Sequence, residues 1–209
     1  MTSIRIIKKR FEQITNAVSR LVEDKYFFKE YKKYLEEHPS INKNNEFLYF
    51  IGLNYVEATT VGIFRQVDKD RRSQSLFNIL NTILTLHKSF TIEKFSRKYL
   101  RVGLGLSHAK KDFAEFSIKD GTKISPKKVK SDIVALLKIT KPVVKYRHKF
   151  VAHKNIRKVS INTKMNDLYS VVDFMEKLII KYQLLLNQAG METLLPQNLV
   201  LDLKEVFKE

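Results

Sequence analysis

Arg147 and His153 are the two residues of this chain whose types and spacing best suit a reaction. They lie in the segment Tyr146–Asn155, which reads YRHKFVAHKN. A histidine can accept or donate a proton near pH 7. An arginine can bind a phosphate through two N–H groups and stabilise added negative charge. Together they suffice in principle to cut RNA without a metal, because the base can deprotonate a 2′-OH that attacks the adjacent phosphorus. DNA lacks that hydroxyl, so this chemistry selects RNA.

The spacing of the pair places a condition on this interpretation. At about 100° per residue, six steps along a straight helix put Arg147 and His153 about 240° apart. The two side chains meet only if the helix ends or bends between them, or if a second copy of the chain completes the site across a two-fold axis. The alternative interpretation is a basic helix end exposed to water, on which His153 is only a local hydrogen-bonding group.

Composition limits the partners and the other chemistries. The chain has 39 Lys and Arg against 22 Asp and Glu, a net charge of +17, which favours a polyanionic partner such as nucleic acid. The basic residues are spread along the chain rather than gathered on one amphipathic helix, which argues against a membrane partner. There is no cysteine, and the histidines have no spacing typical of a metal site. We therefore expect no metal and no cofactor.

The N-terminal part of the sequence predicts a long helix over residues 3–37. Its apolar residues recur in steps of three and four, as in a heptad seam: Ile4, Ile7, Phe11, Ile14, Val18 and Leu21. Such a seam packs against a partner helix, either within the chain or in a second subunit. A second helix is expected from residue 45 to about 67, followed by the polar loop Asp68–Ser75.

Capping residues and helix breakers predict the remaining elements. Ser75 and Thr91 each suit the start of a helix, and the two glycines of VGLGLS (102–107) predict a break after the second of these. Ser125 followed by proline predicts another start. Pro142 should kink that helix or open a new one capped by Thr140. A last long helix is expected over about 166–187, with its stop at Gly190 and a short helix after it over 199–207.

These elements predict one all-α domain over residues 1–209, a bundle of about five to seven helices. With only six Gly and four Pro, the chain has few residues for the tight turns of a many-stranded β-fold. No uninterrupted apolar run approaches the length of about 18 residues that spans a bilayer. The N-terminal segment also lacks the apolar stretch of a signal peptide. We therefore expect a cytoplasmic protein with no membrane partner.

Two segments resemble the HEPN superfamily, and in particular its AbiU-type abortive-infection branch. The first is the signature of an Arg, a polar residue directly after it, and a His four to six positions on, which here are Arg147, His148 and His153 within KYRHKFVAHKN. The second is the upstream segment IFRQVDKDRRSQSLFNIL (Ile63–Leu80), with an Arg-bearing helix end, an acidic loop and a Ser-Leu helix start. The resemblance covers roughly residues 45–190, with the helix over 3–37 packing on that part or on a partner.

The resemblance implies a helical homodimer whose motifs meet in a cleft. It implies a metal-independent endoribonuclease of a phage-defence or toxin–antitoxin system, with RNA and a cognate antitoxin protein as partners. By position, Arg147 and His153 would be catalytic and His148 would take the polar place after the arginine. Lys149 and Lys154 are expected to contact the RNA backbone, on charge alone.

Other outcomes stay open from the sequence. Some HEPN toxins carry a Tyr two residues after the motif His, where a partner nucleotidyltransferase modifies them; here that position is Asn155. Some HEPN proteins are inactive interaction modules. The alternative function is therefore a non-catalytic, basic helical module that binds RNA or a partner protein. A third is a purely structural subunit of a defence complex, which the heptad seam would suit.

Overall fold

The computed structural model describes residues 4–42, 46–151 and 164–199. These residues form eight α-helices, with a 3₁₀ turn at His87–Ser89 and a π turn at Arg147–Val151. The α-helices are α1 (Ile4–Glu37), α2 (Pro39–Asn42), α3 (Glu46–Val67), α4 (Leu76–Thr85), α5 (Ile92–Arg101), α6 (Gly105–Phe113), α7 (Pro126–Tyr146) and α8 (Met165–Asn187). The described residues contain no strand, only two isolated β-bridges. The prediction of an all-α bundle is confirmed. With the four-residue α2 counted, the described residues contain one helix more than the five to seven expected.

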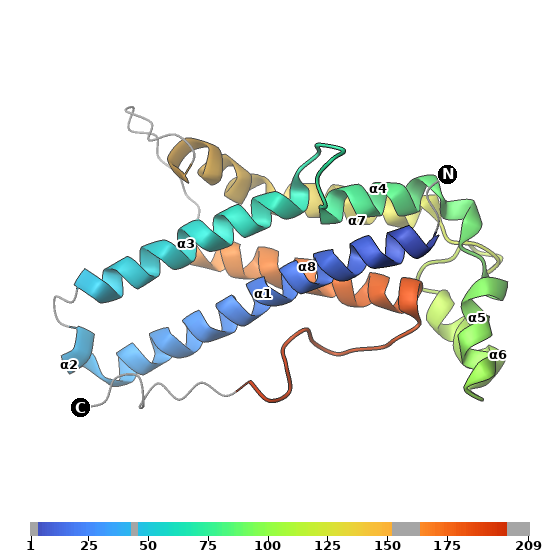
Figure 1. The fold of residues 1–209 in the computed structure, drawn as a ribbon, viewed down its shortest axis with the longest axis horizontal. Coiled ribbons are helices and arrows are strands. Elements are labelled where there is room, and N and C mark those ends of the chain that lie inside the picture. The colour runs from blue at the N-terminus through green and yellow to red at the C-terminus, as the bar shows by residue number, and fades with distance from the viewer. Residues whose placement is uncertain (1–3, 43–45, 152–163, 200–209) are drawn as a thin grey trace.

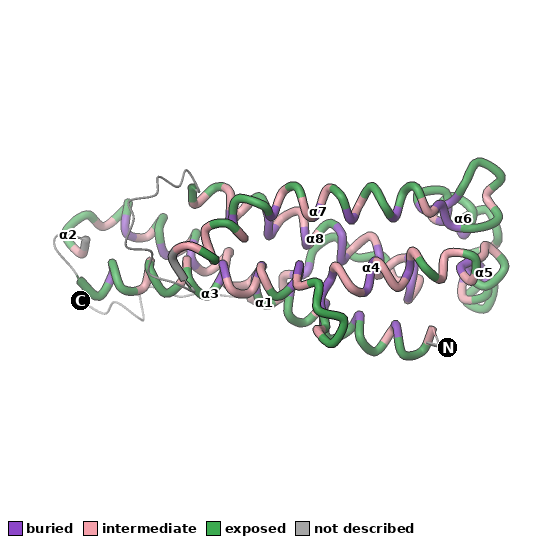
Figure 2. The backbone as a smooth tube through the Cα atoms, turned by 90° about the horizontal axis from the view of Figure 1, so that it is seen from above, coloured by how far each residue is buried: buried purple, intermediate pink, exposed green. Residues whose placement is uncertain are grey.

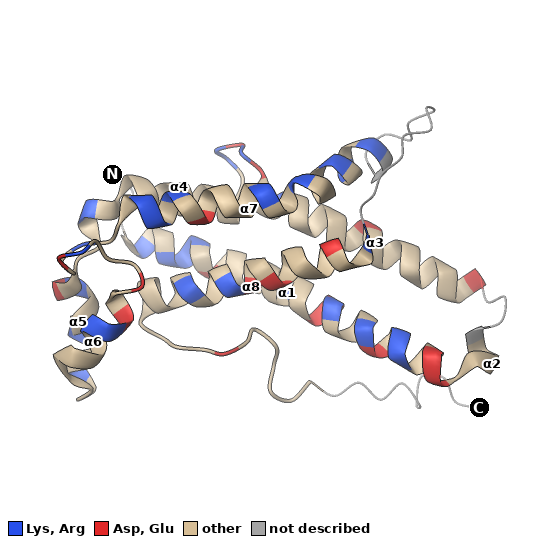
Figure 3. Ribbon diagram, turned by 180° about the vertical axis from the view of Figure 1, so that it is seen from behind, with Lys and Arg blue, Asp and Glu red and all other residues tan. Residues whose placement is uncertain are grey.

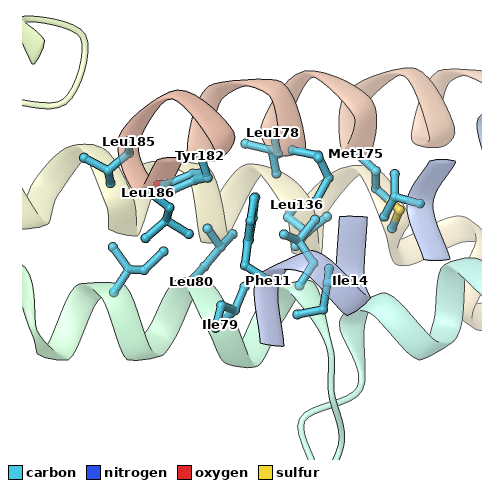
Figure 4. Close-up of a cluster of buried hydrophobic side chains, with 14 of the residues drawn as sticks. Phe11, Ile14, Ile79, Leu80, Leu136, Met175, Leu178, Tyr182, Leu185 and Leu186 are labelled. Atoms are coloured by element: carbon cyan, nitrogen blue, oxygen red, sulfur yellow. The ribbon is translucent and has the colours of Figure 1, made fainter. Parts of the chain in front are cut away.

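The long helices α1, α3, α7 and α8 form the body of the bundle, and α5 and α6 pack together at one end of it (Figure 1). The seam of α1 is buried within the chain, against α8, α3 and α4. Buried residues therefore recur on the inner side of the long helices (Figure 2). In the middle of the bundle, Phe11 of α1 and Leu80 of α4 point toward Leu136 of α7 and Tyr182 of α8 (Figure 4). One intramolecular core thus uses the heptad pattern, which needs no second subunit to be buried.

Helix α3 crosses α1 closely and has two contrasting faces. A Cβ atom at Gly62 would lie 2.6 Å from Cδ2 of Leu21, so only a residue without a side chain fits this crossing unless Leu21 moves. The face turned inward carries the buried Thr59 and Thr60. The outer face of the N-terminal half carries large exposed apolar residues: Phe47, Tyr49, Phe50 and Leu53. Half of α3 therefore presents apolar surface that stays exposed in the described part of the chain.

Local sequence signals set most helix starts. Ser75, Thr91 and Ser125 are the N-caps of α4, α5 and α7, and each hydroxyl accepts a hydrogen bond from a backbone N–H of the first helical turn. The predicted break after α5 is also confirmed. Gly103 has φ +78° and its N–H donates to the Leu100 carbonyl, a left-handed helix end that glycine adopts without steric cost.

The last helix is confirmed, and one detail of its stop differs. Helix α8 ends at Asn187 as expected, but its C-cap is Gln188, in the left-handed conformation (φ 48°), rather than Gly190. Of the two alternatives at Pro142, a new helix is wrong, because Pro142 lies inside α7. Thr140 is not a cap there, because its hydroxyl donates to the Leu136 carbonyl (2.7 Å) within the continuing helix. The short helix predicted over 199–207 lies almost wholly outside the described residues.

Candidate functional site

Arg147 begins a wide turn at the end of α7. Its backbone N–H donates to the carbonyls of Val143 and Val144, and the π turn Arg147–Val151 follows. A π turn closes hydrogen bonds over five residues instead of four, and it often occurs at functional sites. The angle of about 240° expected for a straight α-helix therefore does not apply across this segment. The winding of the helix changes within the turn itself, and His153 lies beyond the described residues.

Phe64 of α3 holds the arginine in place. The guanidinium carbon of Arg147 lies 4.2 Å from the centroid of the Phe64 ring, a cation–π contact. The ring of His148 meets the same phenyl ring edge-on, with centroids 5.4 Å apart. Nη1 of Arg147 lies 3.5 Å from Nδ1 of His148, a long contact in which the guanidinium N–H donates. Arg147 is half-buried and His148 exposed, so the charged group is fixed on one side and open to solvent on the other.

A pocket of about 380 Å³ opens beside this cluster. Its lining comes from the end of α3, the start of the following loop, α7 and the π turn: Phe64, Val67, Asp68, Lys69, Leu137, Thr140, Lys141, Val144 and His148. Two lysines outnumber the single carboxylate in this lining. Arg147 is not part of this lining but lies on the Phe64 ring at its edge. The two ammonium groups therefore favour an anion such as a phosphate in or beside the pocket.

The loop Asp68–Ser75 that borders the pocket is tied down by its own side chains. The Ser75 hydroxyl donates to the Asp68 carbonyl (2.7 Å), and the Asn78 amide donates to the Asp70 carbonyl (2.7 Å). Arg72 pairs with the Asp70 carboxylate (2.7 Å). These hydrogen bonds from Arg72 hold the pKa of Asp70 below its usual value. The loop therefore joins α3 to α4 in one defined conformation (the teal loop between them in Figure 1).

The structure brings some of the predicted site residues together and leaves others undescribed. Arg147 and His148 share the Phe64 ring, and Lys149 is half-buried in the same turn. His153 and Lys154 lie outside the described residues. Among the described residues, no group of three or more His, Asp or Glu side chains could hold a metal ion.

Motif reasoning missed Phe64, Lys69 and Lys141. Phe64 and Lys69 belong to the upstream segment Ile63–Leu80 that carried half of the resemblance. No role for them followed from that segment, because the contact with Arg147 joins positions far apart in the chain. Nothing in the sequence indicated a role for Lys141, which stands directly before Pro142.

A comparison with family models decides the relationship. The model for AbiU2 proteins of the HEPN type matches residues 5–206 of the chain. The chain belongs to the HEPN-type AbiU2 family. No curated protein and no solved structure gives a match.

Membership of the AbiU2 family indicates a function related to abortive infection. The resemblance inferred from two short segments is confirmed, and the match extends beyond them over nearly the whole chain, the long N-terminal helix included. In this AbiU2-type chain the two segments are spatial neighbours, because Phe64 from the first supports Arg147 from the second.

Proposed function

We propose that this AbiU2-type protein is a metal-independent endoribonuclease that cuts RNA with Arg147 and His153 in a cleft between two copies of the chain. The observation that carries the proposal is Arg147 itself, seated on Phe64 beside a pocket whose lining is positively charged. A fixed guanidinium open on one side can meet a scissile phosphate without first being ordered, which favours stabilisation of the transition state. The proposed setting is the cytoplasm, in a phage-defence or toxin–antitoxin system, where a cognate antitoxin protein would be a further partner.

The reaction needs only one base, one acid and one cation. His153 would take the proton from the 2′-OH of the nucleotide before the cut. The 2′ oxygen then bonds to phosphorus while the bond from phosphorus to the 5′ oxygen breaks, and the leaving 5′ oxygen takes a proton from water. The products are a 2′,3′-cyclic phosphate and a 5′-OH. Arg147 would stabilise the extra charge on the phosphorane oxygens, with His148 beside it holding the guanidinium and Lys149 and Lys154 binding flanking phosphates.

The apolar outer face of α3 supports a dimer. Phe47 is 61% exposed, Tyr49 71% and Phe50 59%, and large exposed apolar patches mark interaction surfaces. The same helix carries Phe64, the seat of Arg147, at its other end. Two copies packed with their α3 helices parallel would therefore have both motifs at the same end of the interface.

A second copy suits α3 better than a lipid bilayer does. By length and composition alone α3 could cross a membrane: an 18-residue window has mean hydropathy 1.3 and only 28% of it is buried. The core helices of soluble proteins pass the same test. Asn54 and Glu57 are exposed in the middle of the helix, where a carboxylate in lipid is costly. A protein interface can provide polar partners for both.

The alternative is a non-catalytic module that binds RNA or a partner protein through its positive surface. The net charge of +17 and the lysines beside Arg147 would serve binding as well as cleavage. The two functions differ in the fate of bound RNA.

Cleavage in EDTA tests the proposed function directly. End-labelled RNA incubated with the purified chain and EDTA should be cut to products with a 2′,3′-cyclic phosphate. One 2′-deoxyribose at the cut position should stop cleavage there, because the attacking oxygen is gone, and DNA of the same sequence is the control. RNA that is bound but never cut would favour the binding module, and a requirement for added divalent metal would overturn the mechanism.

Phe64 gives a second prediction. Replacing Phe64 by Leu keeps an apolar side chain but removes the π face under Arg147, so kcat should fall about tenfold to a hundredfold while KM changes little. Phe64→Tyr keeps the ring and should keep the parent kcat. Steady-state cleavage kinetics of the two variants provide the comparison. Equal kcat for Phe64→Leu and the parent would show that the ring does not position the arginine.

A further inference from the structure

A second hollow lies on the other side of the loop Asp68–Ser75. It has a volume of about 660 Å³ and runs between the N-terminal turns of α1, the loop and α4. The polar and charged side chains that line it are Arg10, Lys69, Arg71, Ser73, Gln74, Ser75, Asn78, Asn81, Thr82 and Thr85. We call it the loop groove. Its lining contains three cations and no acid, so it favours an anionic ligand.

The three cations of the loop groove are not neutralised by the chain. Asp70 is the acid next to Arg71 in sequence, but its carboxylate is held by Arg72 (2.7 Å). Within the described ranges, no ion pair joins Arg10, Lys69 or Arg71 to an acid. All three are exposed. Lys69 lies over the Phe77 ring, 5.7 Å from its centroid, a contact that leaves its positive charge in place. The charge of all three is therefore available to an anionic ligand.

The amides of the loop groove are fixed for recognition. The Asn81 amide N–H donates to the Phe77 carbonyl (2.8 Å), and that of Asn78 donates to the carbonyls of Asp70 (2.7 Å) and Ser73 (3.1 Å). Asn78 also lies within hydrogen-bonding distance of the Ser73 hydroxyl (3.0 Å), so each amide is held by at least one hydrogen bond to the backbone. Their orientation is therefore set, and the amide oxygens remain as acceptors for groups such as ribose hydroxyls and base amines.

Lys69 connects the loop groove to the site of Arg147. It lines both the groove and the pocket that contains His148. Lys and Arg positions occur on this loop, beside acidic ones, and again on the helical segment after α7 (Figure 3). Lys69 thus lies between the site of Arg147 on one side and the groove cations Arg71 and Arg10 on the other.

We propose that the loop groove holds the single strand of RNA that extends from the cut position, with Arg10, Lys69 and Arg71 on successive phosphates. An extended strand carries one phosphate per nucleotide, which suits a row of unpaired cations, and a fixed set of amide oxygens suits the polar edges of its bases. This inference deepens the proposed function and rests on it for the identity of the strand, whereas the groove and its charge do not depend on cleavage.

Binding of a non-cleavable strand tests the groove without using cleavage. The probe is a fluorescent, fully 2′-O-methylated single-stranded RNA of about 12 nucleotides, and anisotropy gives its Kd over a range of salt concentrations. The double variant Arg10→Ala/Arg71→Ala should bind about tenfold more weakly at low salt. Its slope of log K against log salt should fall by about 1.4, since a single strand loses about 0.7 for each phosphate contact.

The matched control removes the same charge elsewhere. Arg97 and Arg101 are exposed on α5 and do not line the groove. Arg97→Ala/Arg101→Ala should leave both the Kd and the salt slope close to those of the parent. Equal losses in the two double variants would mean that only net charge matters and would overturn the inference. So would equally tight binding of poly-glutamate, lost in the groove variant, because the groove would then dock an acidic protein.

The two proposals fail in different ways. If the groove variant binds weakly but the parent never cuts RNA, the groove inference stands and the ribonuclease proposal falls. If the parent cuts RNA but the groove variant binds the probe as the parent does, the ribonuclease stands and the RNA strand runs elsewhere.

Discussion

Replacing Arg147 by Ala should reduce RNA cleavage by about a thousandfold or more. Loss of one donor to a developing oxyanion costs about 10²–10³ in rate, and Arg147 would supply both a fork of donors and a full positive charge. His153→Ala should abolish cleavage in the same way, because no proton acceptor would remain for the 2′-OH. Single-turnover cleavage in EDTA measures both variants.

Two further variants sharpen this result. Arg147→Lys keeps the charge but loses the planar fork and its stacking on Phe64, so it should restore only part of the rate. Lys145→Ala removes an exposed cation two residues away and is the matched control, with a rate close to that of the parent. If Arg147→Ala and His153→Ala both cut RNA as fast as Lys145→Ala, the proposed site is wrong.

Mixing the two inactive variants tests whether one site draws on two chains. In co-expressed Arg147→Ala and His153→Ala chains, about half of the dimers are mixed. If Arg147 of one chain works with His153 of the other, one of the two sites in each mixed dimer is intact. About a quarter of the parent rate should then return. No recovery despite confirmed mixed dimers would place both residues of a site on one chain.

Leu80→Ala is the substitution with the largest expected effect on stability. Leu80 of α4 is completely buried in the middle of the bundle, where it points toward α7 and α8 (Figure 4). Truncating a buried leucine costs about 2–5 kcal/mol, from lost burial and from the cavity left behind. For a chain of this size a loss of about 3 kcal/mol lowers Tm by about 6–12 °C. Urea unfolding and thermal melts followed by circular dichroism measure the change.

Leu100→Ala is the matched control for Leu80→Ala. Leu100 is also a leucine of a ten-residue helix, but it is 56% exposed. The same truncation there should change the free energy of unfolding by less than about 0.5 kcal/mol. Similar losses at the two positions would contradict the described core.

Local signals predicted the elements well. The capping residues Ser75, Thr91 and Ser125 lie at the helix starts as predicted. Such a cap is predictable because its hydroxyl needs a hydrogen-bond partner only from the first turn of its own helix. The seam of α1 was equally readable, although the pattern alone did not tell whether its partner was inside the chain. The end of α8 at Asn187 was predicted, but the residue that closes it was not, because a left-handed residue was expected to be glycine and Gln188 takes that conformation instead.

The site was predictable in its motif but not in its surroundings. Arg147 was identified from residue type and spacing, whereas its seat on Phe64 depends on how α3 packs against α7. No short-range pattern encodes such a contact. The positive lining of the two hollows beside Lys69 was likewise hidden within a net charge spread over the whole chain. Net charge predicted a class of partner; only the fold indicates where that partner could lie.

The wide turn at Arg147–Val151 makes this part of the chain sensitive to its length. A π turn accommodates one more residue than an α-helical turn does. Removing that residue would let regular winding resume and would rotate each later residue of the turn by about 100° relative to α7. Changes of residue type at the spacer positions disturb only local contacts. The number of residues in this turn is thus itself a structural parameter, set by backbone phase rather than by side-chain chemistry.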